Sequence, residues 1–219
     1  MAKLLSKQIE KLKTGILELG AIVEERVHLA VQALMSLDAG LAEKIVRDDE
    51  EINHREVDLE EECLKVLALY QPVAIDLRFI IAILKINNDL ERIGDLAVSI
   101  AQRTRFLAQQ PERIAPPTNL PLMADKTQSM LKRSLDSLVH LDSPTARGVL
   151  ECDKEVDAIR HEINRLMYEA MRRNPARLEC YIQVLLAASH LERIADHATN
   201  IAEDVIYLAE GEIVRHGAL

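Results

Sequence analysis

The chain has 219 residues, of which 48% are hydrophobic and 29% are charged, with only 7 glycines, 7 prolines and no tryptophan. Glycine and proline are together about half as frequent as in average proteins, which argues against a turn-rich, all-β protein and predicts an all-α fold. The formal net charge of −9 argues against binding to nucleic acid or to an anionic membrane surface. A cation or a basic partner is more compatible with this charge.

No segment is predicted to enter a membrane. The longest uninterrupted apolar run, Phe79 to Leu84, is far shorter than the roughly 20 residues that a spanning helix requires. The N-terminus lacks the apolar core of a signal peptide. Cys63, Cys152 and Cys180 are odd in number and widely spaced, which favours neither a disulfide framework nor a thiolate metal site. We therefore expect a soluble, cytoplasmic protein with reduced, buried thiols.

Prolines and one glycine divide the chain into six predicted helices, because proline cannot continue a helix. The predicted helices cover residues 3–38, 41–70, 73–109, 120–142, 145–173 and 176–210. Helical periodicity supports these divisions. In the first segment, apolar residues from Ile9 to Leu37 recur at steps of three and four, a stripe that needs helical neighbours to cover it. The proline-rich stretch 111–121 is the longest break and divides the chain nearly in half.

The two halves of the sequence resemble each other. Residues 90–95 read LERIGD and recur as LERIAD at residues 191–196, an offset of 101. Further upstream the offset is 104, and the length difference falls at the turn between the second and third helices of each half. The repeat predicts two similar three-helix bundles, residues 1–110 and 111–219. Helices of this length would extend about 45 Å, so we expect an elongated molecule.

The third helix of each half carries a stripe that changes from apolar to acidic along its length. At steps of three and four, the stripes contain Leu77, Ile81, Leu84, Asn88, Glu91 and Asp95 in the first half, and Leu178, Ile182, Leu185, Ser189, Glu192 and Asp196 in the second. Because the stripe begins as predicted core, we expect these acidic pairs to be partly buried. Neighbouring carboxylates in such a position repel one another, which favours a bound positive charge.

The second helix of each half supplies more polar residues at the same level. These polar residues lie about as many residues before the turn between the second and third helices as the Glu-x-x-x-Asp pair lies after that turn. Antiparallel packing of the two helices would therefore bring the two sets together. Carboxylates without thiolates suit Fe³⁺, Mn²⁺ or Mg²⁺, and Zn²⁺ is also compatible. The predicted metal ligands are Glu91, Asp95, Asp49 and Asn53 in the first half, and Glu192, Asp196, Asp153 and Asp157 in the second.

Two alternatives use the same residues. Arg92 and Arg193 could pair with the acids, giving a metal-free helical interaction module. A metal-dependent enzyme would need an open coordination position and a proton-transfer group, for which His197 is a weak candidate. A di-iron oxidase needs Glu-x-x-His on two helices. One such motif runs from Glu51 to His54, and Ala158 replaces the histidine in the repeat of that segment.

With its doubled Leu-Glu-Arg-Ile-Gly/Ala-Asp motif, six helices and two similar halves, the sequence resembles the PhoU family of bacterial phosphate-uptake regulators. The resemblance covers the whole chain. It implies a non-enzymatic, cytoplasmic homodimer that represses the phosphate-starvation response when phosphate is plentiful. The implied partners are the ATPase subunit of the phosphate ABC transporter and the phosphate-sensing histidine kinase. It also implies that the Glu91/Asp95 and Glu192/Asp196 motifs bind multinuclear iron or zinc clusters.

The sequence departs from perfect repetition at two of the relevant positions. Asn53 stands where the second half has Asp157, and Leu96 stands where the second half has His197. Asparagine can offer an oxygen but brings no negative charge to offset a cation. We therefore expect the first-half site to be weaker or to hold fewer metal ions.

Overall fold

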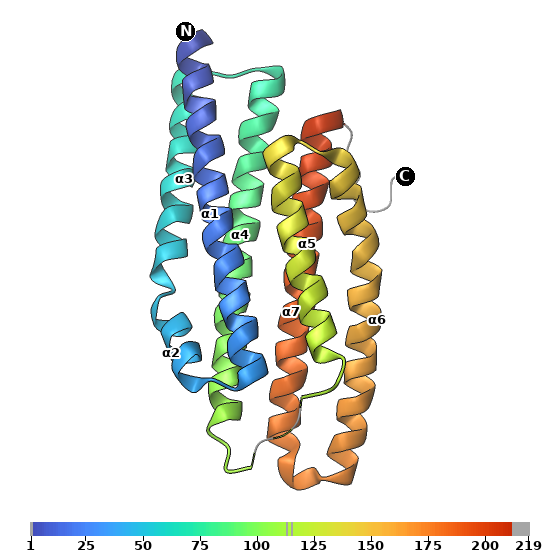
Figure 1. Cartoon of the computed structure of the whole chain (residues 1–219). Helices are drawn as coiled ribbons and strands as arrows, with labels where there is room; N and C mark the ends of the chain where they lie inside the picture. Colours follow the sequence, from blue (N-terminus) through green and yellow to red (C-terminus); the bar gives the residue numbers. More distant parts are fainter. Residues whose placement is uncertain (1, 113, 115, 212–219) are drawn as a thin grey trace.

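The computed structural model describes residues 2–112, 114 and 116–211, and Figure 1 shows long helices lying side by side. The helices of this described part are α1 (Ala2–Ser36), α2 (Ala39–Arg47), α3 (Glu50–Tyr70), α4 (Ala74–Ala108), α5 (Leu120–His140), α6 (Ser143–Arg173), the short 3-10 turn η1 (Pro175–Arg177) and α7 (Leu178–Glu210). No described residue lies in a β-strand. The predicted all-α fold is confirmed.

One predicted helix is divided in the structure. The segment 41–70 is divided at Asp48 and Asp49, where α2 ends and α3 begins. The matching segment of the second half is a single continuous helix, α6. This helix also begins two residues earlier than predicted, because Pro144 lies within its first turn, where proline is tolerated.

The first turn of each half is built in the same way. Leu37 and Leu141 adopt positive φ angles of 52° and 51°, and the following aspartate caps the next helix. Asp38 Oδ1 accepts a hydrogen bond from the Leu41 backbone N–H at 3.0 Å, and Asp142 Oδ1 accepts one from Thr145 at 3.2 Å. These caps satisfy backbone donors that have no partner within the helix. The repeat therefore extends to local geometry.

The helices form two bundles that share one core. Helices α1, α3 and α4 pack together, as do α5, α6 and α7, while α2 covers α1 and α4. The largest helix–helix contact joins α4 to α7, and α1 also contacts α5. Figure 1 shows α4 and α7 running side by side between the outer helices α3 and α6. The buried apolar residues of both halves belong to a single cluster, so the bundles are fused along their length.

The predicted burial of the apolar stripe was wrong. Leu77 and Ile81 on α4 are 39% and 37% exposed, and Leu178 and Ile182 on α7 are 45% and 39% exposed. The neighbouring Ile80 is completely buried. The core of α4 and α7 lies on the adjacent face, which meets the other bundle and α1 or α5. The acidic residues thus continue a partly exposed stripe.

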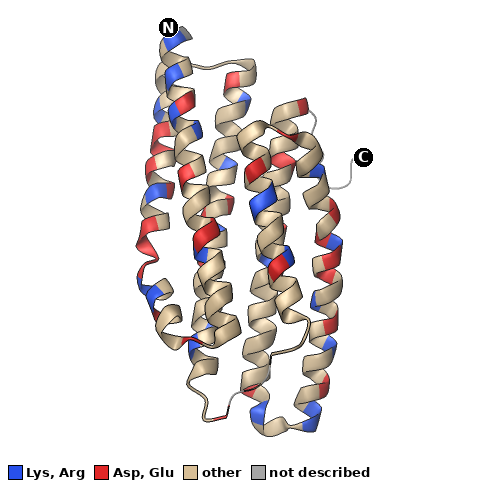
Figure 2. Cartoon of the chain, in the orientation of Figure 1, with Lys and Arg blue, Asp and Glu red and all other residues tan. Residues whose placement is uncertain are grey.

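The surface of the bundle is charged, and its cysteines are not paired. Charged residues of both signs are spread along α3 and α6, as Figure 2 shows. No helix in the described part of the chain is long and apolar enough to cross a membrane. The three cysteines are free thiols, with Cys63 and Cys180 buried and Cys152 half-buried. Burial, with nearby Glu60 and Glu62, raises the pKa of Cys63 to about 12.

Candidate functional site

The first half gathers four carboxylates between the start of α3 and the middle of α4; we name Asp49, Glu56, Glu91 and Asp95 the first acidic cluster. Burial raises the pKa of Glu91 above its ordinary value, and the charges of Asp95, Glu56 and Asp49 raise it further. Burial and the charge of Asp95 likewise raise the pKa of Asp49. The side chains are therefore close enough to destabilise one another's ionised forms.

The structure replaces one predicted member of this cluster. Asn53 is exposed and makes no hydrogen bond to the cluster within the described part of the chain. Glu56, one turn further along α3, takes part instead. Burial raises its pKa, and so does the charge of Glu60. The sequence did offer a signal, because Glu56 lies seven residues, or about two helical turns, after Asp49.

One oxygen of the first acidic cluster lacks a partner. Oδ1 of Asp49 is buried and has no hydrogen-bond partner among the described residues. Buried polar atoms are normally satisfied by protein groups, water or an ion. An unpartnered carboxylate oxygen beside three other carboxylates has the donor chemistry that hard cations prefer.

Arg92 already offsets part of this negative charge. Its Nε lies 3.3 Å from Glu91 Oε2, and its Nη1 lies 3.5 Å from Asp95 Oδ2. The Arg92 side chain is 55% exposed, so these pairs contribute little stability. They are nevertheless the arrangement that a metal-free interaction module predicts.

The second half gathers all four of its predicted residues; we name Asp153, Asp157, Glu192 and Asp196 the second acidic cluster. Burial and the charges of Asp157, Asp196 and Glu192 raise the pKa of Asp153 from 3.8 to about 6. Partial burial of the Asp196 carboxyl, with the charges of Glu192 and Asp157, also raises its pKa, although the residue as a whole is exposed. Arg193 is exposed, and its charge, together with that of His197, opposes the rise in the pKa of Asp196.

Neither cluster is a finished coordination shell. Among the described residues, no three His, Cys, Asp or Glu side chains are arranged so that they could hold a metal ion as they stand. The carboxylates repel one another across short distances without converging on one point. Binding an ion at either cluster would require rotation of Asp and Glu side chains, which move readily between staggered rotamers.

A polar seam between α4 and α7 joins the helices that carry the two clusters. His197 Nδ1 lies 2.7 Å from Asp89 Oδ1, and Asn200 Nδ2 donates to the same oxygen at 3.2 Å. Lys85 Nζ lies 3.3 Å from Asp204 Oδ1. Sequence repetition gave no sign of this seam, because these pairs cross between the halves. His197, the weak candidate for proton transfer, is bonded to Asp89 here.

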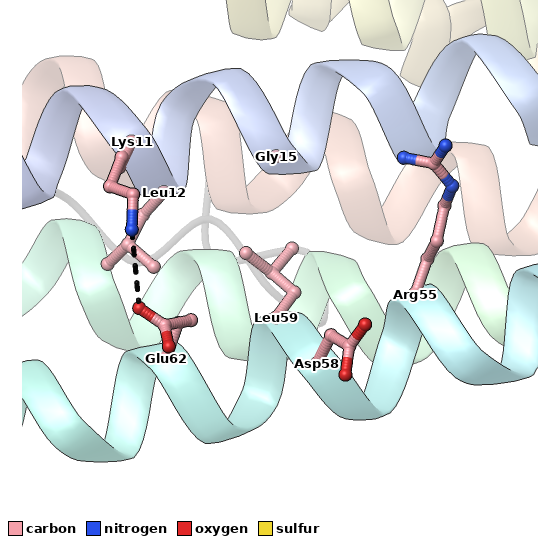
Figure 3. Close-up of a pocket in the computed structure, with 7 residues that line it drawn as sticks. All are labelled: Lys11, Leu12, Gly15, Arg55, Asp58, Leu59 and Glu62. Carbon is pink, nitrogen blue, oxygen red and sulfur yellow. Dashed lines mark ion pairs between the residues drawn. The ribbon is translucent and has the colours of Figure 1, made fainter.

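A separate hollow of about 190 Å³ lies between α1 and α3, outside both clusters (Figure 3). Leu59 lies opposite Gly15, where an added Cβ would come within 3.1 Å of it. Lys11 Nζ lies 3.8 Å from Glu62 Oε2 at one end. At the other end, Arg55 pairs with residues of α1 and α3. Of the charged residues that line this hollow, Lys11 and Glu62 thus pair with each other, and Arg55 pairs with residues outside the lining.

Together, these features define a class of protein: a duplicated helical bundle in which each repeat holds an acidic cluster between its second and third helices. The family model described as the PhoU domain matches residues 16–104 and again residues 120–205. The chain therefore belongs to the PhoU family.

Curated relatives and solved structures agree with this membership. The chain is 38% identical over 212 residues to the phosphate-specific transport system accessory protein PhoU homolog of Pseudomonas putida, covering 97% of this chain and 83% of the relative. It is 39% identical to the Aquifex aeolicus homolog, covering 97% and 96%. The crystal structure of PhoU from Pseudomonas aeruginosa superposes with a TM-score of 0.91 at 37% identity, covering 94% of this chain and 99% of that one. The phosphate transport system regulatory protein PhoU from Streptococcus pneumoniae gives a TM-score of 0.89 at 30% identity, covering 96% and 99%.

Proposed function

We propose that this protein is a non-enzymatic, cytoplasmic regulator of phosphate transport that represses the phosphate-starvation response. The names of its relatives, an accessory or regulatory protein of phosphate transport, support the general role. The proposed partners are the ATPase subunit of the phosphate ABC transporter and the phosphate-sensing histidine kinase, and the proposed assembly is a homodimer. Repression and both partners rest on the family resemblance.

We further propose that each acidic cluster binds metal ions, as a multinuclear iron or zinc site, with Mn²⁺ or Mg²⁺ also compatible. The observation that carries this proposal is the crowding of partly buried carboxylates within each cluster, where burial and mutual repulsion raise the pKa of Asp153 to about 6. The unpartnered Asp49 Oδ1 supports it in the first half. The proposed ligands are Asp49, Glu56, Glu91 and Asp95 in the first half, and Asp153, Asp157, Glu192 and Asp196 in the second. A bound cation would relieve the repulsion and link the second helix to the third.

Metal analysis of paired variants tests this site. Glu192→Ala combined with Asp196→Ala should lower the metal content of purified, untagged protein, measured by elemental analysis, because two ligands of the second acidic cluster are lost. Glu162→Ala combined with Glu169→Ala is the matched control. It removes two acids that pair with Arg165 on α6, away from either cluster. Equal metal content in wild type and the cluster variant would remove these residues from the site.

Co-purification tests the regulatory role. When the protein is captured from phosphate-replete cells at its natural expression level, the transporter ATPase subunit and the sensor kinase should be recovered with it. Cells that carry the untagged protein provide the background. Recovery of neither subunit above that background would contradict the proposed partners.

A metal-free interaction module is the second candidate, and the Arg92 ion pairs with Glu91 and Asp95 favour it. In that case the arginine supplies the positive charge that the first acidic cluster needs. Protein purified without added metal would then contain none, and its melting temperature would not change on adding Mn²⁺, Zn²⁺ or Fe²⁺. A rise in melting temperature with any of these ions would exclude this candidate.

A further inference from the structure

The second helix is built differently in the two halves. In the second half, α6 runs unbroken through Asp153. In the first half, the corresponding segment is interrupted at Asp48 and Asp49, between α2 and α3. No proline or glycine lies at this break, and Asp49, the N-cap residue of α3, makes no side-chain capping hydrogen bond. Asp49, a member of the first acidic cluster, is one of the two interrupted residues.

A buried arginine from another helix occupies the break. Arg26 on α1 is only 7% exposed. Its Nη1 donates to the Ile45 carbonyl at 3.3 Å, and its Nη2 donates to the Asp48 carbonyl at 2.9 Å. In a continuous helix these carbonyls would accept from the backbone N–H groups of Asp49 and Ile52. Neither of those backbone bonds is formed within this described segment. The guanidinium has taken the place of two helical hydrogen bonds.

The repeat supplies an internal comparison. With the offset of 104, Arg26 corresponds to Met130, which is 1% exposed on α5. Methionine has no donor with which to bond a carbonyl. In that half the second helix remains continuous. The half with arginine at this position has a broken second helix, and the half with methionine has a continuous one.

The break changes the surroundings of the first acidic cluster. A cavity of about 620 Å³ lies at the break, lined by Arg26, Ile45, Asp48 and other residues of α1, α2 and α3. Arg26 also lies close to this cluster, because the Asp48 carbonyl to which its Nη2 donates at 2.9 Å belongs to the residue directly before Asp49. The second acidic cluster has Met130 in the matching place. The first cluster thus has a fixed buried cation beside it that the second lacks.

We infer that Arg26 is a positioning residue that holds the second helix of the first half open, and that it thereby makes the first acidic cluster the weaker of two cation sites. The inference rests on the proposed binding of cations at the clusters. Removing Arg26 has two effects in the same direction. The segment closes towards the continuous helix of the second half, and a positive charge that repels bound cations is lost.

Hydrogen exchange tests the hold on the break without any metal. In Arg26→Met, the backbone amides of Asp49 to Ile52 should exchange more slowly than in wild type, because they regain helical hydrogen bonds. Arg26→Gln, whose side-chain amide can donate a hydrogen bond to one carbonyl, should give an intermediate exchange rate. If Arg26→Met does not fold, Arg26→Gln is the variant to compare with wild type. Arg55→Met removes an equal charge from the same half and should leave these amides unchanged. Wild-type exchange rates in both Arg26 variants would overturn the inference.

A Mn²⁺ titration tests the effect on cation binding. In protein carrying Glu192→Ala and Asp196→Ala, the first acidic cluster is the remaining site, and unbound Mn²⁺ is measured by electron paramagnetic resonance. Adding Arg26→Met should tighten Mn²⁺ binding at least about threefold, whereas adding Arg55→Met should change it less than about twofold. Unchanged or weaker binding in the Arg26→Met protein would overturn the inference while leaving the proposed metal sites intact. Absence of Mn²⁺ binding at both clusters of the wild type would instead reject the metal sites, and hydrogen exchange would still decide whether Arg26 holds the break.

Discussion

Among single residues of the second acidic cluster, Asp153 has a strongly raised pKa. Its pKa is raised from 3.8 to about 6 by burial and by Asp157, Asp196 and Glu192. A carboxyl whose pKa is higher in the folded protein than in the unfolded chain stabilises the fold when protonated. That contribution is fully present below about pH 4 and is lost as the pH rises through about 6.

Asp153→Asn should therefore raise the melting temperature of chelator-treated protein at pH 7, and the gain should shrink as the pH approaches 4. The substitution removes the ionisation while keeping a similar shape. Thermal unfolding followed by circular dichroism between pH 4 and 7 measures the effect. Glu151→Gln, at an exposed position on the same helix, is the control and should show little change. An Asp153→Asn protein less stable than wild type at pH 7 would contradict the described repulsion.

Residue positions in the clusters were predictable to the extent that helical spacing determines them. The distance from the turn predicts the level of Asp49, Glu91 and Asp95 along the bundle. The steps of three and four predict the helix face on which each residue lies. Asn53 was misplaced because Ile52 faces α4, where Gly94 leaves room for it. A Cβ at Gly94 would come within 3.0 Å of Ile52 Cδ1.

Glu56 was missed because the repeat gives no support for it, since Arg160 occupies the matching position in the second half. Ligation of metal by any of these residues stays a prediction.

At the scale of helices, α4 shows which apolar positions form the core. Ile80 is completely buried, whereas the adjacent Ile81 is 37% exposed. Periodicity alone placed Ile81 in the core, because α4 is apolar on more than one face. Its true inner face is determined by α1 and α7, whose positions the local sequence does not reveal.

Ile80→Ala should destabilise the protein by about 2–5 kcal/mol, because it removes buried methyl groups and leaves a cavity. Ile81→Ala should cost about 1 kcal/mol or less, since much of that side chain already contacts water. Urea denaturation with a linear extrapolation measures both values. Comparable losses at the two positions would mean that the stripe through Ile81 is part of the core after all.

Helix boundaries were largely predictable from the prolines, and the main failure, the break between α2 and α3, has a tertiary cause. The break between α2 and α3 lies in a stretch of charged residues without a local helix breaker. It coincides with Arg26, which is about 20 residues away in sequence and reaches the break only after the chain has folded. Single-helix patterns cannot contain that information.

For the whole molecule, duplication predicted two three-helix bundles, and the structure fuses them through α4 and α7. The shared core and the Asp89–His197–Asn200 contacts cross between the halves. Repetition predicts what is common to the halves. It cannot predict contacts made by residues that differ between the halves. Asp89, for example, corresponds to His190 in the second half.

The fused core predicts that both halves unfold together. Differential scanning calorimetry of the whole chain should show one transition, with a calorimetric enthalpy equal to the van't Hoff enthalpy. Two resolved transitions would contradict this expectation, because they would mean that each bundle is stable without the other.

The proposal that both acidic clusters bind cations is tested most directly by crystals of the protein grown with Mn²⁺ and measured near the manganese absorption edge. Anomalous difference density locates each ion without assumptions about its ligands. We predict peaks among the carboxylates of both clusters, with Arg92 displaced from Glu91 and Asp95. Absence of density at both clusters, with the Arg92 ion pairs intact, would contradict the proposal.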